Sequence, residues 1–377
     1  MKYRRGSLYS ILLTHNNQKF AKEIRDVFLK IPVSDKYNDH DLSVKCIYTN
    51  DKKLKDNSSV SLFVDDNNIA SRLIGRWFDR NSITGECNTD LIRSRGMYNA
   101  SEFDKAIAEK SLRGNALLED AGEELIGNTF LLVNDITYHD KAQTGKAIGG
   151  IFRAVGAIYS AYSGDNSFAD LGNSVGSLAE TLKGFAVNVD TYLYQLVWDE
   201  ASSSEFYTNY YADIPDDIKK ESFDNNRHHF RMKFVGQQHS DGSTTSFMGI
   251  KADEPEQMIR KACQRALDEN IANLQKNYET FKVKTPLVST SPLSAYIGLK
   301  EGVSEKSQYE VLEVSVDKNG KRTYKRVGII KPIPNMIWDD RYMAIEENAY
   351  GADFKYTTFQ KVSGKDFYPG LLIREIK

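Results

Sequence analysis

Apolar residues follow two different spacings over the first 285 residues of the chain. Runs rich in β-branched and aromatic residues predict strands, whereas apolar residues repeated every three or four positions predict amphipathic helices. The predicted strands are 42–49, 128–138, 187–199 and 228–238, and the predicted helices are 65–80, 101–125, 202–214 and 254–278. Helices and strands therefore alternate, which favours an α/β or α+β sandwich.

The clearest helix signal covers residues 254–278. Asp253 stands at the N-cap position, and Glu256 completes a capping box three residues later. The apolar residues that follow share one face of the predicted helix: Ile259, Ala262, Cys263, Ala266, Leu267, Ile271, Leu274 and Tyr278. This helix is expected to pack one side against a core.

The chain changes character after Pro286, where short strand-like runs replace helical spacing. Residues 309–330 predict a hairpin, because two β-rich runs flank Asn319 and Gly320 and glycine accepts the positive φ of a tight turn. Further strands are predicted at 355–362 and 370–377. This pattern is typical of a small all-β barrel.

These patterns together predict an α+β protein of the α/β sandwich type, followed by a small SH3-like barrel. The expected division is an N-terminal extension at 1–40, an α/β domain at 41–285 and the barrel at 286–377. A segment rich in Gly, Ala and Ser, at 142–185, interrupts the α/β domain between two strands.

The segment 142–185 carries small residues and an apolar stripe, both at helical spacing. Its candidate interaction residues lie on that stripe: Ile148, Phe152, Val155 and Tyr159. Small residues four apart let helices approach closely. Two interpretations stay open: a helical hairpin packed on its own domain, or an oligomerisation element that also contacts a membrane surface through 145–163.

Composition narrows the function classes only a little. The chain has 377 residues, 40% hydrophobic residues and a formal net charge of −2, which is ordinary for a globular protein and gives no electrostatic case for nucleic acid. Cys46, Cys87 and Cys263 are widely spaced and are expected to be separate thiols. The sequence contains no apolar run of about 18 residues, and no cofactor motif was found.

The sequence offers weak candidates for catalysis. Ser174 lies in GNSVG, which matches the G-x-S-x-G pattern, but no apolar strand precedes it as a nucleophile elbow requires. His139 and Asp140 stand together at a strand end, as a surface turn or a dyad. His228 and His229 are expected on opposite faces of a strand, which disfavours a shared metal. A hydrolase using His139, Asp140 or Ser174 is the alternative function.

Trp338 is the remaining candidate interaction residue. It lies in IWDDRY, at 337–342, beside two carboxylates and an arginine. This segment is expected either to cover the barrel with an Asp–Arg pair or to form the rim of a peptide- or glycan-binding surface.

The order of elements resembles that of the curli assembly and transport (CsgG-like) and TolB N-terminal-like envelope proteins. The stretches that carry the resemblance are NNIASRLIGRWFDR and AVNVDTYLYQLVWD, on either side of the insertion. The C-terminal AYIGLKEGVSEKSQYEVLE is similar to the small barrel of the flagellar assembly protein T family, and the chain also resembles envelope proteins of Bacteroides-type bacteria. In the curli channel the insertion supplies membrane hairpins, whereas 142–185 has a helical pattern.

The resemblance implies a periplasmic or envelope-associated protein with an assembly or lipid-contacting role and no catalytic residues. Its implied partner is a second copy of the chain or another envelope protein. The basic N-terminus is followed by an apolar run too short for a signal peptide, so we expect a cytoplasmic protein or the mature part of an exported one.

Overall fold

The computed structural model describes the chain in two compact units. The described residues are 6–15, 18, 20–34, 36–39, 42, 44–49, 56–99, 125–140, 185–243, 255–316, 322–344 and 354–376. The first unit lies within Met1–Leu13, Pro32–Asn134 and Tyr192–Gln237, and the second lies within Thr14–Ile31, Asp135–Thr191 and Gln238–Lys377. Each unit is described separately below.

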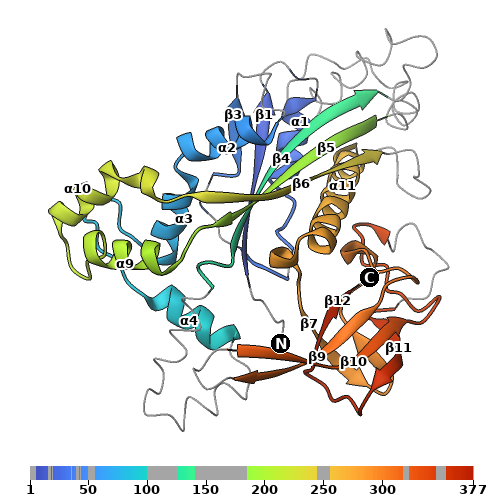
Figure 1. Cartoon of the computed structure of the whole chain (residues 1–377). Helices are drawn as coiled ribbons and strands as arrows, with labels where there is room; N and C mark the ends of the chain where they lie inside the picture. Colours follow the sequence, from blue (N-terminus) through green and yellow to red (C-terminus); the bar gives the residue numbers. More distant parts are fainter. Residues whose placement is uncertain are drawn as a thin grey trace, which may run out of the picture. The chain divides into compact units, whose positions relative to one another are not determined.

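A mixed β-sheet has the strand order β2-β1-β4-β5-β6, with β3 also paired to β1 (Figure 1). Strands β1 and β2 are parallel, with Ser7 opposite Asn38. The strands are β1 (Ser7–His15), β2 (Asn38–Asp39), β3 (Cys46–Thr49), β4 (Thr129–Asp140), β5 (Phe185–Leu196) and β6 (Met232–Ser243). Strand β1, which falls in the expected N-terminal extension, is buried along most of its length, because it lies inside the sheet between β2 and β4.

The helices of the first unit pack around Trp77 and Phe78, which are fully buried. Trp77 donates from Nε1 to Thr129 Oγ1 at 2.8 Å, so its one polar atom is satisfied within the core. The described helices of this unit are α2 (Asn57–Asp66), α3 (Ile69–Trp77), α4 (Asp90–Asn99), α9 (Glu200–Asn209), α10 (Asp217–Asn225) and the 3₁₀ turn η2 (Arg227–His229).

In the second unit α1 (Ala21–Phe28) packs against the long helix α11 (Pro255–Asn277). Asn270 of α11 is buried and donates from Nδ2 to the carbonyl of Val189 and the hydroxyl of Thr191, both at 2.9 Å. These bonds fix α11 to β5 within this unit.

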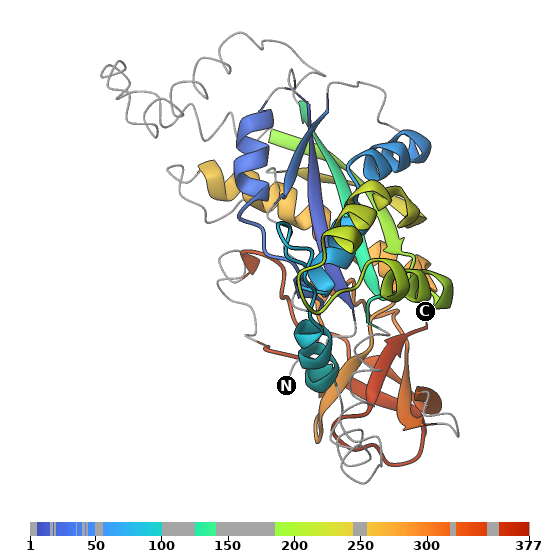
Figure 2. The same cartoon turned by 90° about the vertical axis from the view of Figure 1, so that its left-hand side faces the viewer.

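A closed barrel of order β10-β11-β8-β7-β12-β9 follows α11 and the 3₁₀ turn η3 (Glu279–Phe281) (Figure 2). Its core contains Leu287, Val311, Ile330, Phe359 and Ile373. Its elements are β7 (Thr285–Thr290), β8 (Leu293–Ala295), the 3₁₀ turn η4 (Leu299–Glu301), β9 (Tyr309–Val316), β10 (Arg322–Pro332), β11 (Thr357–Gly364) and β12 (Leu372–Glu375). The predicted α+β region followed by an all-β barrel is therefore confirmed at this coarse level.

Two predicted elements were wrong in detail. The helix expected at 65–80 is α3, and it begins only at Ile69, because Asn68 adopts a left-handed conformation (φ 52°) after the end of α2. The strand expected at 228–238 begins only at Met232, after the turn η2. The helix expected at 101–125 lies almost entirely outside the described residues, whereas Cys46, Cys87 and Cys263 form no disulfide, as expected.

Candidate functional site

The candidate site is formed by a turn at 81–87 and by the segment 212–218, which leads into α10. Two backbone hydrogen bonds join them: Cys87 N–H to Ala212 C=O at 2.7 Å, and Asp216 N–H to Thr84 C=O at 3.4 Å. The Asp216 side chain then caps α10. The turn and the helix start are therefore held together as one surface.

The turn has a fixed shape because both its side chains and its backbone are constrained. Asn81 accepts at Oδ1 from the backbone N–H of Ile83 (2.8 Å) and of Thr84 (3.1 Å). Gly85 has a φ of 77°, and a Cβ at this position would lie 2.7 Å from Lys220 Cβ. Only glycine meets both conditions, so the turn can lie directly against α10.

Three isoleucines project from this surface into solvent. Ile83 is 80% exposed, Ile214 is 67% exposed and Ile218 is 83% exposed. Isolated exposed apolar residues are common, but apolar residues gathered on one surface indicate an interaction site. We call these three residues the isoleucine patch.

Exposed carboxylates belong to the same segments as the isoleucine patch. Four exposed acidic residues belong to the same two segments and the first turns of α10: Glu86, Asp213, Asp217 and Glu221. The neighbouring cations are engaged by the protein, since Lys219 donates from Nζ to the Tyr211 carbonyl (2.6 Å) and Lys220 to Asp224 Oδ2 (3.2 Å). The surface therefore combines apolar side chains with negative charge.

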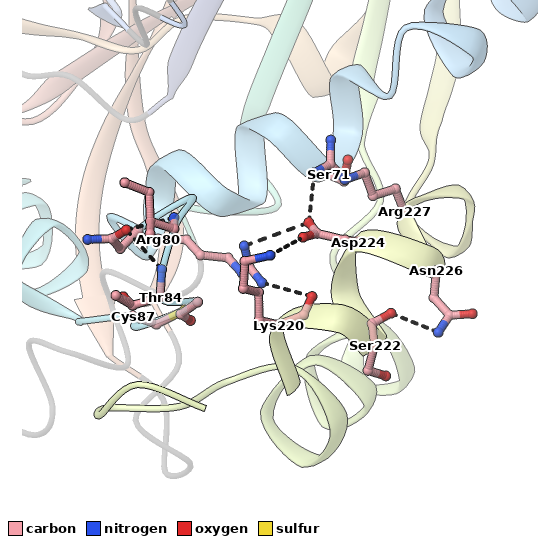
Figure 3. Close-up of polar contacts among 12 residues, drawn as sticks. Ser71, Arg80, Thr84, Cys87, Lys220, Ser222, Asp224, Asn226 and Arg227 are labelled. Carbon is pink, nitrogen blue, oxygen red and sulfur yellow. Dashed lines mark hydrogen bonds and ion pairs between the residues drawn. The ribbon is translucent and has the colours of Figure 1, made fainter. Parts of the chain in front are cut away.

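A cluster of charged residues connects the end of α3 with α10 and the turn η2 (Figure 3). Asp224 of α10 faces three cations, with Arg227 Nη2 at 2.7 Å, Lys220 Nζ at 3.2 Å and Arg80 Nη1 at 4.0 Å. The Arg80 side chain is only 5% exposed and lies over the Phe223 ring, with Cζ 4.2 Å from the ring centroid. It also donates from Nη2 to the Lys220 carbonyl at 3.3 Å. Arg80 thus connects the turn to α10.

The pKa values follow from this arrangement. Burial acts to raise the pKa of Asp224, but hydrogen bonds from Arg227 and Lys220 outweigh it and hold the pKa below its ordinary value. Burial lowers the pKa of Arg80, and the charge of Asp224 opposes that change. The carboxylate therefore stabilises a cation that is otherwise poorly solvated.

Aromatic rings form the layer under α9 and α10. Phe206 is fully buried and its ring centroid lies 4.3 Å from that of Phe78. The rings within contact distance of Phe206 are Phe78, Trp198, Tyr207, Tyr210, Tyr211, Phe223 and Phe230. Such a packed layer gives the helices that carry the patch a rigid base.

The two adjacent histidines lie near this layer, but not as predicted. They belong to the 3₁₀ turn η2, and their rings are 4.5 Å apart rather than on opposite faces of a strand. His229 Nδ1 lies 2.7 Å from Glu205 Oε1, and Tyr210 donates its hydroxyl to the same oxygen at 2.9 Å. Within the described residues, no group of three or more His, Cys, Asp or Glu is placed to hold a metal ion.

Trp338 lies in the second unit, half-buried at the edge of the barrel. Its backbone N–H donates to Thr357 Oγ1 at 3.0 Å, and its ring centroid is 6.5 Å from that of Tyr296. Asp339 and Arg341 form the expected ion pair, with Arg341 Nη2 2.7 Å from Asp339 Oδ2. The backbone of Trp338 also forms an isolated β-bridge with Gly298, so the segment 337–342 contacts the barrel unit without forming a strand.

The other predicted site residues cannot be placed in the same way. Ile148, Phe152, Val155, Tyr159 and Ser174 lie outside the described residues. His139 and Asp140 are the last two residues of β4, but their side chains also lie outside the described part. The isoleucine patch was not predicted, and its only sequence signal is the DIPDDI stretch, in which isoleucines alternate with acidic residues.

Comparison with known proteins gives no guide to this surface. No protein-family model matches the chain, and no curated protein matches it either. Among the described helices, none combines the length and the apolar character that crossing a membrane requires. The functional interpretation therefore depends on the geometry of the site itself.

Proposed function

We propose that the protein is a non-enzymatic cell-envelope protein that acts in assembly, binding another polypeptide through the isoleucine patch. The observation that carries this proposal is the exposure of Ile83, Ile214 and Ile218 on one surface, at 67–83%. Burying an isoleucine side chain completely contributes about 1.5–3 kcal/mol to an interface. Three such residues supply the apolar centre that a specific complex needs.

The rigidity of the surface supports the same proposal. The Asn81 turn, the positive φ of Gly85 and the Arg80–Asp224 contact hold the patch in one shape before any partner arrives. A surface that is ordered in advance loses little conformational entropy on binding. The acidic border adds selectivity, because it repels acidic surfaces and attracts basic ones.

The proposed cellular location rests on the resemblance to envelope assembly proteins. In this proposal the α/β region corresponds to the CsgG-like domain, and the closed barrel is SH3-like, as in the flagellar assembly protein T family. A periplasmic or envelope-associated protein with an assembly role requires a binding surface rather than a catalytic site, and the isoleucine patch supplies one.

A second candidate function is recognition of a peptide or a glycan by the barrel. It is favoured by the aromatic pair of Tyr296, which is 52% exposed, and Trp338. Exposed aromatic rings bind apolar faces of such ligands with little loss of side-chain entropy. Binding of peptide or oligosaccharide arrays by the full chain, lost in Tyr296→Ala, tests this function separately.

The main proposal is tested by light scattering on the full chain over a range of concentrations. The expected result is a weight-average mass that rises with concentration and stays monomeric in the triple variant Ile83→Ser, Ile214→Ser and Ile218→Ser. Leu62→Ser is the matched control, because Leu62 is similarly exposed (65%) but lies on α2 outside the patch. A full chain that remains monomeric throughout would contradict self-assembly through this surface.

A further inference from the structure

The chemistry of the isoleucine patch defines its occupant. The occupant must offer apolar side chains to Ile83, Ile214 and Ile218, and it must carry positive charge to match the surrounding carboxylates. Those carboxylates are Glu86, Asp213, Asp217 and Glu221. A neutral or acidic apolar segment would bury these charges without a counter-charge, which is costly.

The chain itself contains a segment with this composition. Residues 141–164 include three cations and no acidic residue: Lys141, Lys146 and Arg153. Ile148, Phe152, Val155 and Tyr159 recur among them at the spacing of one helix face. The cations therefore flank apolar positions in the segment, as the carboxylates flank isoleucines on the patch.

Two other basic and apolar stretches are already used by the fold. The N-terminal stretch contributes β1, whose apolar residues are buried. The stretch 322–332 forms β10, whose two edges are paired with β9 and β11. Neither is available to bind a distant surface without disrupting a sheet or the barrel.

We infer that the isoleucine patch of one copy binds residues 141–164 of a second copy. The choice of a second copy follows from the proposed assembly function, and among the described residues the three isoleucines remain 67–83% exposed. This inference rests on the proposed assembly function and names its partner. Each copy carries one patch and one segment, so the interface is heterologous and propagates into closed rings or open chains.

A charge-swap experiment on the full chain tests the inference. Lys146→Glu/Arg153→Glu makes the segment acidic, and Asp213→Lys/Glu221→Lys makes the patch border basic. Each double variant alone places like charges across the interface, so its dissociation constant should rise about tenfold or more. A 1:1 mixture of the two should associate again, because each acidic element then meets a basic one. All four substitutions in one chain should also restore self-association.

Lys306→Glu, at an exposed position in the barrel unit, is the control for a change of net charge and should associate as the unmodified chain does. One result would overturn the inference: the full chain and Lys146→Glu/Arg153→Glu associate equally well, while the triple isoleucine variant does not associate. The patch would then bind something other than residues 141–164, and the proposed function would stand with another partner. The inference is also overturned if Lys146→Glu/Arg153→Glu loses binding to anionic vesicles but keeps self-association, since the segment would then bind lipid. A full chain that never associates overturns the inference of a second copy, and the proposed function would then require a different polypeptide as partner.

Discussion

Arg80 and Asp224 lie 4.0 Å apart between Nη1 and Oδ1 and connect the turn after α3 to helix α10. Because the Arg80 side chain is 5% exposed, its charge depends on this carboxylate and on the Phe223 ring. Asp224→Ala should lower the free energy of unfolding by about 1.5–3 kcal/mol, since it removes the carboxylate that faces a buried cation and leaves Arg80 only the Lys220 carbonyl and the Phe223 ring.

Denaturant unfolding followed by circular dichroism measures this loss. Asp90→Ala is the matched control, because Asp90 pairs with Arg93 while its own side chain is 80% exposed. Exposed pairs contribute about 0–1 kcal/mol, so the control should remain close to the unmodified chain. Equal losses in the two variants would show that Asp224 has no special structural role.

Gly85→Ala should both destabilise the chain and weaken its self-association. The substitution adds a Cβ at a φ of 77° and places it 2.7 Å from Lys220 Cβ, so the turn that carries Ile83 must move away from α10. Gly370→Ala separates these two effects, because Gly370 also has a positive φ (97°) but no atom lies within 4 Å of its added Cβ.

The conformational penalty alone is about 1–2 kcal/mol, and it should be the whole effect in Gly370→Ala. Gly85→Ala should lose more stability and, unlike Gly370→Ala, should raise the dissociation constant of self-association. Thermal unfolding and light scattering measure the two quantities. Identical behaviour of the two variants would mean that the close approach to Lys220 is not needed.

The raised pKa of Asp340 should make the stability of the second unit depend on pH. Asp340 is largely buried beside the barrel, accepts from the Lys300 backbone N–H at 2.8 Å, and has a pKa raised to about 8 by burial and by the charge of Glu301. The folded chain therefore binds this proton more tightly than the unfolded chain, whose pKa is near 3.8. The free energy of unfolding should fall as pH rises from about 4 to about 8.

Asp340→Asn should remove the contribution of Asp340 to this fall in the free energy of unfolding, because the amide oxygen still accepts from the Lys300 N–H but the amide does not ionise. The difference in thermal midpoint, variant minus unmodified chain, should therefore increase steadily from pH 4 to pH 8. Asp268, whose pKa burial raises to about 7, should continue to contribute a fall that ends near pH 7. A midpoint difference that is constant with pH would contradict the assignment.

The sequence predicted elements whose signals are local. Strands β4 and β5 follow from apolar runs, and α11 follows from its capping residues and its single apolar face. The exact start of α3 was not predictable, because Asp66, Asn67 and Asn68 are all residues that can cap a helix, and neither Gly nor Pro marks the break. The left-handed backbone of Asn68 is tolerated because asparagine adopts this conformation more readily than most residues.

The candidate site depends on contacts that the sequence does not encode locally. Ile83 and Ile214 are 131 residues apart in the chain and join one surface only because the 81–87 turn bonds to the 212–216 segment. An isoleucine in a sequence predicts burial, so its exposure was visible only in the fold. His228 and His229 were misplaced for a similar reason, since a 3₁₀ turn precedes β6 where the pattern predicted a strand.

Salt should distinguish the proposed interface from a purely apolar one. In the proposed interface, cations of residues 141–164 face exposed carboxylates beside the isoleucine patch, and salt screens such interactions over about 10 Å at 0.1 M. The dissociation constant of self-association should therefore rise with sodium chloride concentration, whereas burial of the isoleucines alone would not be weakened by it.

Asp213→Asn/Glu221→Gln removes two of these charges without adding bulk. This variant should bind more weakly at low salt and should depend less on salt, approaching the unmodified chain as the concentration rises. Light scattering over a salt series gives both slopes, and parallel slopes would show that these carboxylates do not face the bound segment.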